Sequence, residues 1–546
     1  MLSTFTRTFR TALFSLTILA LSGCVSVGAT YWTPPHAAPT MPPELTFLSE
    51  NPLEVVASPT APAGAAVIAA SPTLTPTITL AIKDLPTPQG ALPATPEFTA
   101  TPPAVNDAPI LYYAQAADTL PVVAIRFGVD PVEITSPEPI PDVAFINPGQ
   151  LLVIPRRLGN TTTSTHLIPD SEVVHSPSTV DFDTQAYADK AGGPLGSYRV
   201  FMKSTGMTNG AEVIDRVALE NSVNPRLLLA LLEYHGGWVT GALGHTPDAS
   251  EDYPLGVVIP KYHGLYGQLV WAVNQLSTGY YAYREGRMTA IQFNDGVIAR
   301  LAPDLNAGTA ALQYYFAQRY DSQEWLQAIN PDTGFPALYA DLFDNPWTRS
   351  QSVEPLFPPG IVQPPLILPF MKNWLWAYTG GPHGAWEQEG AYAALDFAPG
   401  STDTGCDVSF TWAVAAASGL VTRSGNGIVA LDLDGDGHEQ TGWVLVYLHI
   451  SQEDQIPVGT WVDVGDPLGH PSCEGGFATG THIHITRKYN GEWIPADGPL
   501  AFNLGGWVAK AGEGPYKGWL QREGVTVTAC TCGNYASRIV RGEIDP

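Results

Sequence analysis

The sequence predicts a multidomain α+β protein, and three observations support this fold class. The chain has 546 residues, of which 45% are hydrophobic, so it is long enough for several domains and too apolar to be disordered throughout. Between residues 181 and 347, apolar side chains recur at the i, i+3 and i+4 spacing of helices. Near the C-terminal end, GTHIHITRKYNG places His482 and His484 two residues apart among β-branched residues, as on a strand. The formal net charge of −26 and the lack of a Lys/Arg run argue against nucleic acid as a partner.

The N-terminus has the order of an export signal. Arg7 and Arg10 precede the apolar run TALFSLTILALSG, which is too short to span a bilayer comfortably and suits the core of a signal peptide. The run ends in LSGC, which resembles a bacterial lipobox, where the cysteine is lipidated and becomes the first residue of the mature protein. We therefore expect residues 1–23 to be a lipoprotein signal peptide and Cys24 to carry the lipid. The protein would be extracytoplasmic and membrane-anchored in the bacterial cell envelope; an ordinary secretory signal with a chance cysteine is the alternative.

Residues 24–107 have the composition of a spacer. They are rich in Pro, Thr and Ala, as in SPTLTPTITL and LPTPQGALPATP. Such a segment cannot bury enough apolar surface to offset chain entropy, and its prolines favour extended conformations. We predict a disordered Pro/Thr-rich linker that extends away from the membrane. Beyond it the sequence has no run of about 18 consecutive apolar residues, so acyl chains rather than a transmembrane helix are expected to hold the protein.

Residues 108–157 are predicted to form a short unit whose order of strands and helix can be read from the sequence. A strand around 110–114 leads to DTL, whose Asp118 and Thr119 can cap a helix, and NPGQ later turns into the strand LLVIP. This order resembles a LysM module, a small βααβ fold, although Ala117 stands where the family commonly has Gly and the Pro-rich SPEPIPD stands where a second helix is expected. LysM modules bind N-acetylglucosamine-containing glycans, so the resemblance implies attachment to peptidoglycan. A domain that keeps the fold without the affinity is the alternative.

Residues 176–350 are expected to form a helical domain. The stretch NPRLLLALLEYHGGW resembles the helix of lytic transglycosylases and lysozyme-like folds that carries the catalytic acid. Here His235 occupies that position, and Glu233, the nearest carboxylate, lies on a different face of the helix. Because glycan cleavage needs a positioned carboxylic acid, we predict a non-catalytic, lysozyme-like module. An unrelated helical spacer with a core histidine is the alternative.

The C-terminal third contains five residues suited to a metal site. On a strand, His482 and His484 share one face, so both imidazoles enter one small volume. The segments TGGPHGAW, AALDFAPG and LVYLHIS add His383, Asp396 and His449. Zinc prefers four ligands drawn from His, Cys and carboxylate, and a catalytic site leaves one position open. Two of the histidines and the aspartate can fill the other three positions.

In this order, residues 360–510 resemble peptidase family M23, the zinc-dependent endopeptidases of bacterial cell walls, which have an antiparallel β fold. The commonest family pattern is H-x-x-x-D, whereas Tyr392 stands four residues before Asp396. The β-lytic branch places its histidine thirteen residues before the aspartate in a T-G-G-x-H context, as His383 does here. The resemblance therefore implies zinc held by His383, Asp396 and His484, with His449 as a further histidine of the cleft.

By the same resemblance, His449 and His482 are the two histidines that line the cleft without binding zinc. An imidazole there can stabilise an oxyanion and pass a proton to the departing amine, so both are catalytic candidates. The implied function is a zinc metalloendopeptidase that hydrolyses peptide cross-links of peptidoglycan, bound to the glycan through the LysM module. The alternative is a non-enzymatic wall-binding protein that activates another murein hydrolase. The presence of all five residues favours the enzyme.

A second metal signal lies in ALDLDGDGHEQTGW. Asp432, Asp434 and Asp436 match the start of an EF-hand loop, and Glu439 would be the most plausible additional calcium ligand. Position twelve of that loop is Trp443 instead of Glu. A β-hairpin with a D-G-D-G turn explains the stretch equally well.

Four cysteines besides the predicted lipidation site suggest two disulfides. They are Cys406, Cys473, Cys530 and Cys532, for which three connectivities are possible. Cysteines two positions apart rarely pair, so we expect Cys530 and Cys532 each to reach elsewhere or to stay partly free. A zinc-binding role for C-x-C is a weaker possibility. Apart from its cysteines, the C-terminal tail, 511–546, predicts little.

Overall fold

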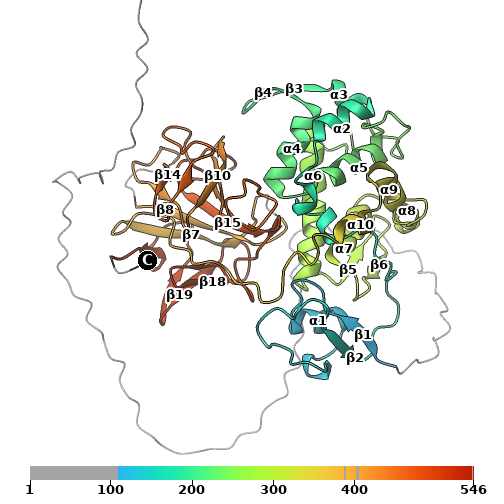
Figure 1. Ribbon diagram of the computed structural model, residues 1–546, viewed down its shortest axis with the longest axis horizontal. Coiled ribbons are helices and arrows are strands. Elements are labelled where there is room, and N and C mark those ends of the chain that lie inside the picture. Colours follow the sequence, from blue (N-terminus) through green and yellow to red (C-terminus); the bar gives the residue numbers. More distant parts are fainter. Residues whose placement is uncertain (1–107, 387–388, 401–404, 544, 546) are drawn as a thin grey trace, which may run out of the picture. The chain divides into compact units, whose positions relative to one another are not determined.

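The computed structural model describes residues 108–386, 389–400, 405–543 and 545 (Figure 1). The predicted signal peptide, Cys24 and the predicted linker lie outside these ranges. In the described part of the chain, none of the helices combines the length and the apolar character that crossing a bilayer requires. The expectation of a mixed α and β chain with a largely antiparallel C-terminal sheet is confirmed.

The first described unit is small and has a core of its own. Strands β1 (Ile110–Tyr113) and β2 (Leu151–Ile154) pair antiparallel, and helix α1 (Leu120–Phe127) lies between them in the chain. The Thr119 side chain accepts a hydrogen bond from the first turn of α1, and Gly128 ends the helix with a φ of 66°. The core contains the side chains of Tyr112, Ala114, Val123, Ala124, Phe127, Ile134, Ile146, Leu152 and Ile154.

Only one α-helix forms in this unit, which corrects the expected βααβ order. The Pro-rich residues 136–142, where the second helix was expected, are irregular, and only a single 3₁₀ turn, η1 (Pro131–Glu133), precedes them. Prolines there remove the backbone donors that a helix needs. Ala117 has a φ of 63°, in the left-handed region that favours glycine.

Residues 184–350 are mainly helical (green to yellow in Figure 1). Helix α4 begins with a capping box of Asn209 and Glu212, and α5 begins with Asn224 as its cap and Pro225 at its first position. The helices are α2 (Thr184–Ala191), α3 (Pro194–Ser197), α4 (Gly210–Asn221), α5 (Pro225–Gly236), α6 (Gly264–Arg284), α7 (Ala307–Ala317), α8 (Ser322–Ala328), α9 (Phe335–Phe343) and α10 (Pro346–Ser350). Two short hairpins, β3 (Arg199–Met202) with β4 (Gly206–Asn209) and β5 (Ala290–Gln292) with β6 (Ile298–Arg300), interrupt them.

A nine-stranded antiparallel sheet dominates the C-terminal region (orange to red in Figure 1). Its path is β13-β10-β11-β12-β15-β8-β7-β21, and β16 pairs with β15 off this path. The strands are β7 (Leu375–His383), β8 (Ala394–Pro399), β10 (Gly419–Gly425), β11 (Ile428–Asp432), β12 (Trp443–Leu448), β13 (Trp461–Val462), β15 (Ile483–Tyr489), β16 (Glu492–Trp493) and β21 (Arg538–Val540). Smaller sheets join β14 (Pro467–Gly469) to β9 (Ala413–Val414), and β17 (Asn503–Leu504), β18 (Trp507–Ala511), β19 (Gly518–Arg522) and β20 (Val525–Thr528) to one another.

Both faces of this sheet are buried, each in a different core. Along β12, Leu445 and Tyr447 point into the core of the β region, whereas Val444, Val446 and Leu448 belong to the core that includes the helices. A hydrogen bond reinforces the contact between the sheet and the helices: the Trp493 indole donates to the Asn221 carbonyl at 3.1 Å. The helical region therefore packs on the sheet face that carries Leu448, and Leu448 lies opposite His484 in the β12–β15 ladder.

Candidate metal centre and catalytic cleft

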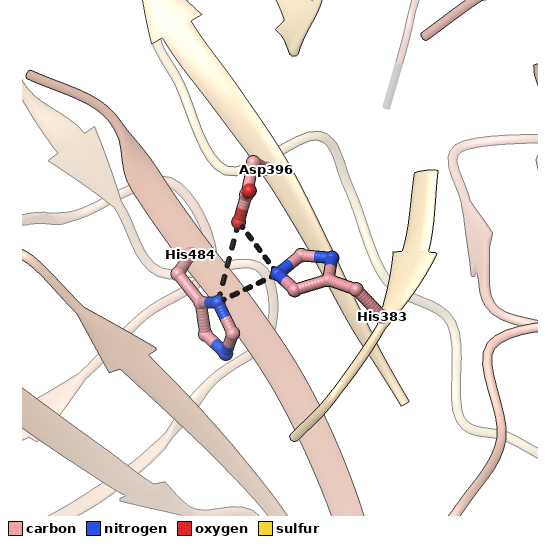
Figure 2. Close-up of side chains that lie close together, drawn as sticks. All are labelled: His383, Asp396 and His484. Atoms are coloured by element: carbon pink, nitrogen blue, oxygen red, sulfur yellow. Dashed lines mark hydrogen bonds and ion pairs between the residues drawn. The ribbon is translucent and has the colours of Figure 1, made fainter. Parts of the chain in front are cut away.

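Three neighbouring strands bring His383, Asp396 and His484 together, and we call these residues the metal triad (Figure 2). His484 on β15 lies opposite Asp396 on β8, and His383 lies at the end of β7. The ladder between β7 and β8 shifts register twice, between Tyr378 and Gly380 and again between Gly380 and His383, as the chain approaches this histidine. His383 Nε2 lies 3.2 Å from Asp396 Oδ1, His484 Nδ1 lies 3.2 Å from the same oxygen, and the two nitrogens are 3.1 Å apart.

The second nitrogen of each triad histidine is committed to a backbone carbonyl. His383 Nδ1 donates to the Gly381 carbonyl at 2.8 Å, and His484 Nε2 donates to the Ala385 carbonyl at 3.0 Å. In neutral imidazoles with these tautomers, the two nitrogens that face each other carry lone pairs, and a carboxylate oxygen lies beside them. Three converging, buried acceptors repel one another unless a cation lies among them.

The triad fits zinc in donor type and in spacing. Ligand atoms about 2.0 to 2.1 Å from a tetrahedral zinc lie about 3.3 Å from one another, close to the observed separations. Zinc-binding histidines usually donate their outer nitrogen to a carbonyl or carboxylate, as both histidines do here. With three protein ligands, a fourth position is left for water or substrate, which is the arrangement of a catalytic site.

Electrostatics within the triad favour the metal-binding forms of Asp396 and His484, whereas His383 is favoured in its protonated form and must release a proton to bind a metal. Burial opposes ionisation of Asp396, but His383 and His484 hold the pKa of its carboxyl well below the usual range. Burial also opposes a charged His383, yet Asp396 raises the pKa of that imidazole. Burial lowers the pKa of His484, so this imidazole is neutral at neutral pH.

His449 and His482, which we call the histidine pair, lie beside the triad with ring centroids 4.4 Å apart. His449 Nδ1 donates to the Glu474 carbonyl at 2.8 Å, and His482 Nδ1 donates to the Gly480 carbonyl at 2.7 Å. These bonds leave the Nε2 atom of each ring available to a substrate. Burial and the neighbouring histidines lower the pKa of His449 to about 3, so the ring is neutral at neutral pH.

The triad and the histidine pair open into one cleft of about 1680 Å³. Its opposite side is lined by side chains of the helical region, among them Tyr266, Asn274 and Tyr314. The structure thus brings together all five site residues that the sequence predicts. The cleft is large enough for an extended peptide.

Tyr516 is a member of the site that the sequence reasoning missed. Its ring stacks on His383 with centroids 4.1 Å apart, and its backbone carbonyl accepts from Gly381 N–H at 3.1 Å. Tyr516 lies between β18 and β19, in a tail where no motif marked it. Its φ of 64° is the one local sign of a special role, and a sequence does not reveal it.

The three predicted calcium ligands Asp432, Asp434 and Asp436 come close together at the end of β11 and in its connection to β12. The expected fourth ligand, Glu439, does not join them. Its buried carboxylate instead binds Arg423, at 2.9 Å, and Lys488, at 3.1 Å. The antiparallel pairing of β11 and β12 agrees with the hairpin interpretation, and calcium binding stays a prediction.

The cysteine pairing differs from the expectation. Cys406 is bonded to Cys473, and Cys530 is bonded to Cys532. The C-x-C pair closes on itself because the chain turns there, with the Gly533 N–H donating to the Cys530 carbonyl. Neither cysteine of that pair is therefore free or available to a metal.

His235 in the helical region has a structural environment. Its side chain is fully buried, and its ring nitrogens bond to Thr246 at 2.7 Å and Tyr315 at 3.0 Å. The Glu233 carboxylate is also buried and accepts from the backbone of Val239 and Thr240. Neither residue is placed to act as the acid that glycan cleavage requires.

Comparison with known proteins gives matches to one family model and to one protease from two strains. The family model for the N-terminal domain of LasA matches residues 166–356. Protease LasA of Pseudomonas aeruginosa (strain UCBPP-PA14) is 26% identical over 303 residues, covering 52% of this chain and 68% of that protein. The chain is homologous to protease LasA. LasA of a second strain, PAO1, is 25% identical. The match to the LasA N-terminal domain includes α2 to α10, where the sequence predicted a lysozyme-like module.

Solved M23 metallopeptidases are also similar to part of the chain. Pseudoalterin, an M23 metalloprotease from the deep sea, is 25% identical and covers 31% of this chain and 96% of its own, with a TM-score of 0.26. A putative M23 peptidase from Pseudomonas aeruginosa is 26% identical, covering 27% and 55%, with a TM-score of 0.18. The catalytic domain of lysostaphin from Staphylococcus simulans is 22% identical, covering 23% and 90%, with a TM-score of 0.17.

Proposed function

We propose that the protein is a zinc-dependent metalloendopeptidase that hydrolyses peptide cross-links of bacterial peptidoglycan. The observation that carries this proposal is the metal triad, in which three buried acceptor atoms lie 3.1 to 3.2 Å apart and backbone carbonyls fix both histidine tautomers. Homology to a protease supports peptide hydrolysis as the reaction. The cleft between the triad and the helical region offers room for the substrate.

The residues of the chain divide the chemistry between them. When bound, zinc acts as a Lewis acid toward a carbonyl group and lowers the pKa of water. His383, Asp396 and His484 would hold it. The Nε2 atoms of His449 and His482 face the cleft and can accept a proton from the nucleophile or donate one to the departing amine.

The proposal extends to the location of the enzyme. The LSGC motif supports a lipid anchor on Cys24, and the Pro/Thr-rich residues 24–107 would extend the protein away from the membrane. The unit formed by β1, α1 and β2 would bind N-acetylglucosamine-containing strands as a LysM module. Such binding would concentrate the peptidase on its substrate.

The test incubates the full-length protein, in detergent and loaded with zinc, with purified peptidoglycan. New free amines report peptide cleavage, and new reducing ends report glycan cleavage. We expect new amines without new reducing ends, and we expect a chelator to abolish them and zinc to restore them. His383→Ala should remove the activity, whereas His438→Ala, a change in a histidine of the β11–β12 connection outside the triad and the pair, should leave it intact.

Two results would overturn the proposal. Reducing ends without amines would indicate a glycan-cleaving enzyme instead of a peptidase. The absence of both products, with the protein still sedimenting with the wall, would favour the non-enzymatic activator. In that case, adding the protein to a separate murein hydrolase should increase the rate of that enzyme.

A further inference from the structure

The histidine pair is supported by two loop segments, and one disulfide joins these segments. Residues 472–474 contact His449, and residues 405–407 contact the residue before His482. Cys473 lies in the middle of the first segment and Cys406 in the middle of the second, and the two cysteines are bonded to each other. No regular strand includes either segment.

The first segment holds His449 from both of its sides. The Ser472 N–H donates to the His449 carbonyl at 2.6 Å, and the His449 imidazole donates to the Glu474 carbonyl at 2.8 Å. His449 has a φ of 64°, a left-handed conformation that is unfavourable for a residue with a side chain. External contacts must hold such a residue in place, and these two bonds flank Cys473.

The second segment holds the chain next to His482. The Thr481 N–H donates to the Gly405 carbonyl at 2.9 Å, and the Thr481 hydroxyl donates to the Asp407 carbonyl. These two acceptors flank Cys406 in the same way that Ser472 and Glu474 flank Cys473. The disulfide therefore connects the support of one histidine directly to the support of the other.

We propose that the Cys406–Cys473 disulfide is a redox-sensitive positioning element for the histidine pair, a proposal that rests on the proposed peptidase function. The metal triad does not depend on it in the same way, because His383 and Asp396 lie on strands β7 and β8 and His484 on β15. Reduction separates the two segments and lets the histidines leave their catalytic positions while the metal stays bound.

The disulfide is accessible to a reductant, since Cys406 is exposed and Cys473 is partly exposed. Reduction adds two electrons and two protons, breaks the S–S bond and leaves two thiols. A thiol reductant supplies the electrons and the protons in two exchange steps, through a mixed disulfide, and is itself oxidised to a disulfide. The product is an enzyme that keeps zinc and loses turnover.

The experiment compares the full-length, zinc-loaded, oxidised protein with and without a phosphine reductant. The phosphine takes up oxygen from water and becomes a phosphine oxide. Unlike a thiol, it does not compete for zinc. We measure kcat, KM, zinc content and hydrogen exchange of residues 471–482. We expect kcat to fall about 10- to 100-fold, as for the loss of a supporting partner, with KM and zinc unchanged. Exchange should rise at 471–482 but not in β15, and reoxidation should restore kcat.

Variants separate this disulfide from the other one. Cys406→Ser with Cys473→Ser should have a low kcat that the phosphine no longer changes. Cys530→Ser with Cys532→Ser, which removes the Cys530–Cys532 disulfide, should keep a normal kcat and remain sensitive to the phosphine. If the first double variant does not fold, reduction of the unchanged protein still gives the result.

Other outcomes decide against the proposal. If thiol labelling shows Cys406 and Cys473 reduced while kcat is unchanged, the disulfide does not position the histidines. If zinc is lost together with activity, the disulfide supports the whole site and not the pair. Should the oxidised protein hydrolyse no peptide, the proposed function fails, and hydrogen exchange alone decides: faster exchange at 471–482 with β15 protected supports the positioning role, and unchanged exchange overturns it.

Discussion

The metal triad and the histidine pair line the same cleft but are supported by different kinds of structure. The triad lies on three adjacent strands, so the register of the sheet sets its distances. The histidine pair depends on loop carbonyls at Gly480 and Glu474 and on one disulfide. Metal ligands need fixed spacing, which the register of a sheet supplies. The positions of groups that transfer protons can instead be set by loops. The two regions should therefore fail separately when each is altered.

The largest effect is expected from a change in the triad. Asp396→Ala removes the one anionic ligand and should lower peptidoglycan hydrolysis by about 10³-fold or more, because the metal itself is lost. Zinc content after dialysis, measured by atomic absorption, should fall to background. A variant that kept both its zinc and its activity would show that Asp396 is not a ligand.

A change in the pair should reduce activity without releasing the metal. His449→Ala removes a group that can transfer a proton, so kcat should fall about 10²- to 10⁴-fold while zinc content stays at one per chain. Measuring kcat and zinc on the same preparation checks this. Loss of zinc from this variant would contradict the separation of the two regions.

A smaller effect is expected from a residue that only borders the triad. At Gly380 an added Cβ would lie 2.4 Å from Asp396 Oδ2, so Gly380→Ala must displace the carboxylate. We expect zinc affinity to fall about 10- to 100-fold, as for a lost supporting partner of a metal ligand. Competition with a chelator measures the affinity. Gly159→Ala, where nothing lies within 4 Å of the added atom, is the matched control and should bind zinc normally.

The smallest effect on the site is expected from a change in the stability of the whole fold with pH. Burial raises the pKa of Glu492 to about 7, and Arg284, Asp170, Tyr280 and Tyr281 surround its carboxylate. The folded protein therefore binds this proton more tightly than the unfolded chain, whose value is near 4.5. Stability should be greatest below about pH 4.5 for this group and should fall by up to about 3 kcal/mol as pH rises through 7.

Urea unfolding of the zinc-loaded protein at pH 5 and pH 8 measures that change. Glu492→Gln cannot ionise and should show a smaller decrease over the same range. Zinc content of the folded protein should be the same at both pH values. A decrease that is as large in Glu492→Gln as in the unchanged protein would show that other groups cause it.

The site was predictable where spacing along the chain becomes proximity in a sheet. The H-x-H pattern predicted His482 and His484 on one strand; in the structure His484 lies on β15, whereas His482 immediately precedes that strand and forms an isolated bridge with Ser472. The thirteen-residue spacing linked His383 to Asp396, and the structure brings these four residues together with His449. Only the H-x-H relation depends on strand periodicity, which a sequence displays. The pairing of His383 with Asp396 was implied by the resemblance to the β-lytic branch of peptidase family M23.

The supporting partners were not predictable, because they are backbone atoms or residues from distant loops. The carbonyl of Ala385 fixes His484, and that of Glu474 fixes His449, yet any residue type offers such a carbonyl. Tyr516 reaches His383 from the C-terminal tail without a motif. Glu439 was assigned to calcium because ion pairs with Arg423 and Lys488 are visible only after folding.

The shared core beneath the helices has a consequence for how the protein can be divided. The helical region packs against Val444, Val446 and Leu448 of β12. Leu448 lies opposite His484 on the neighbouring strand β15. A fragment cut between the helical region and the β region would leave this apolar stripe in water, at roughly 25 cal/mol per Å² of newly exposed surface. The helical region and the β region are thus coupled in folding. Calorimetry should record one heat-absorption peak in which both regions unfold together.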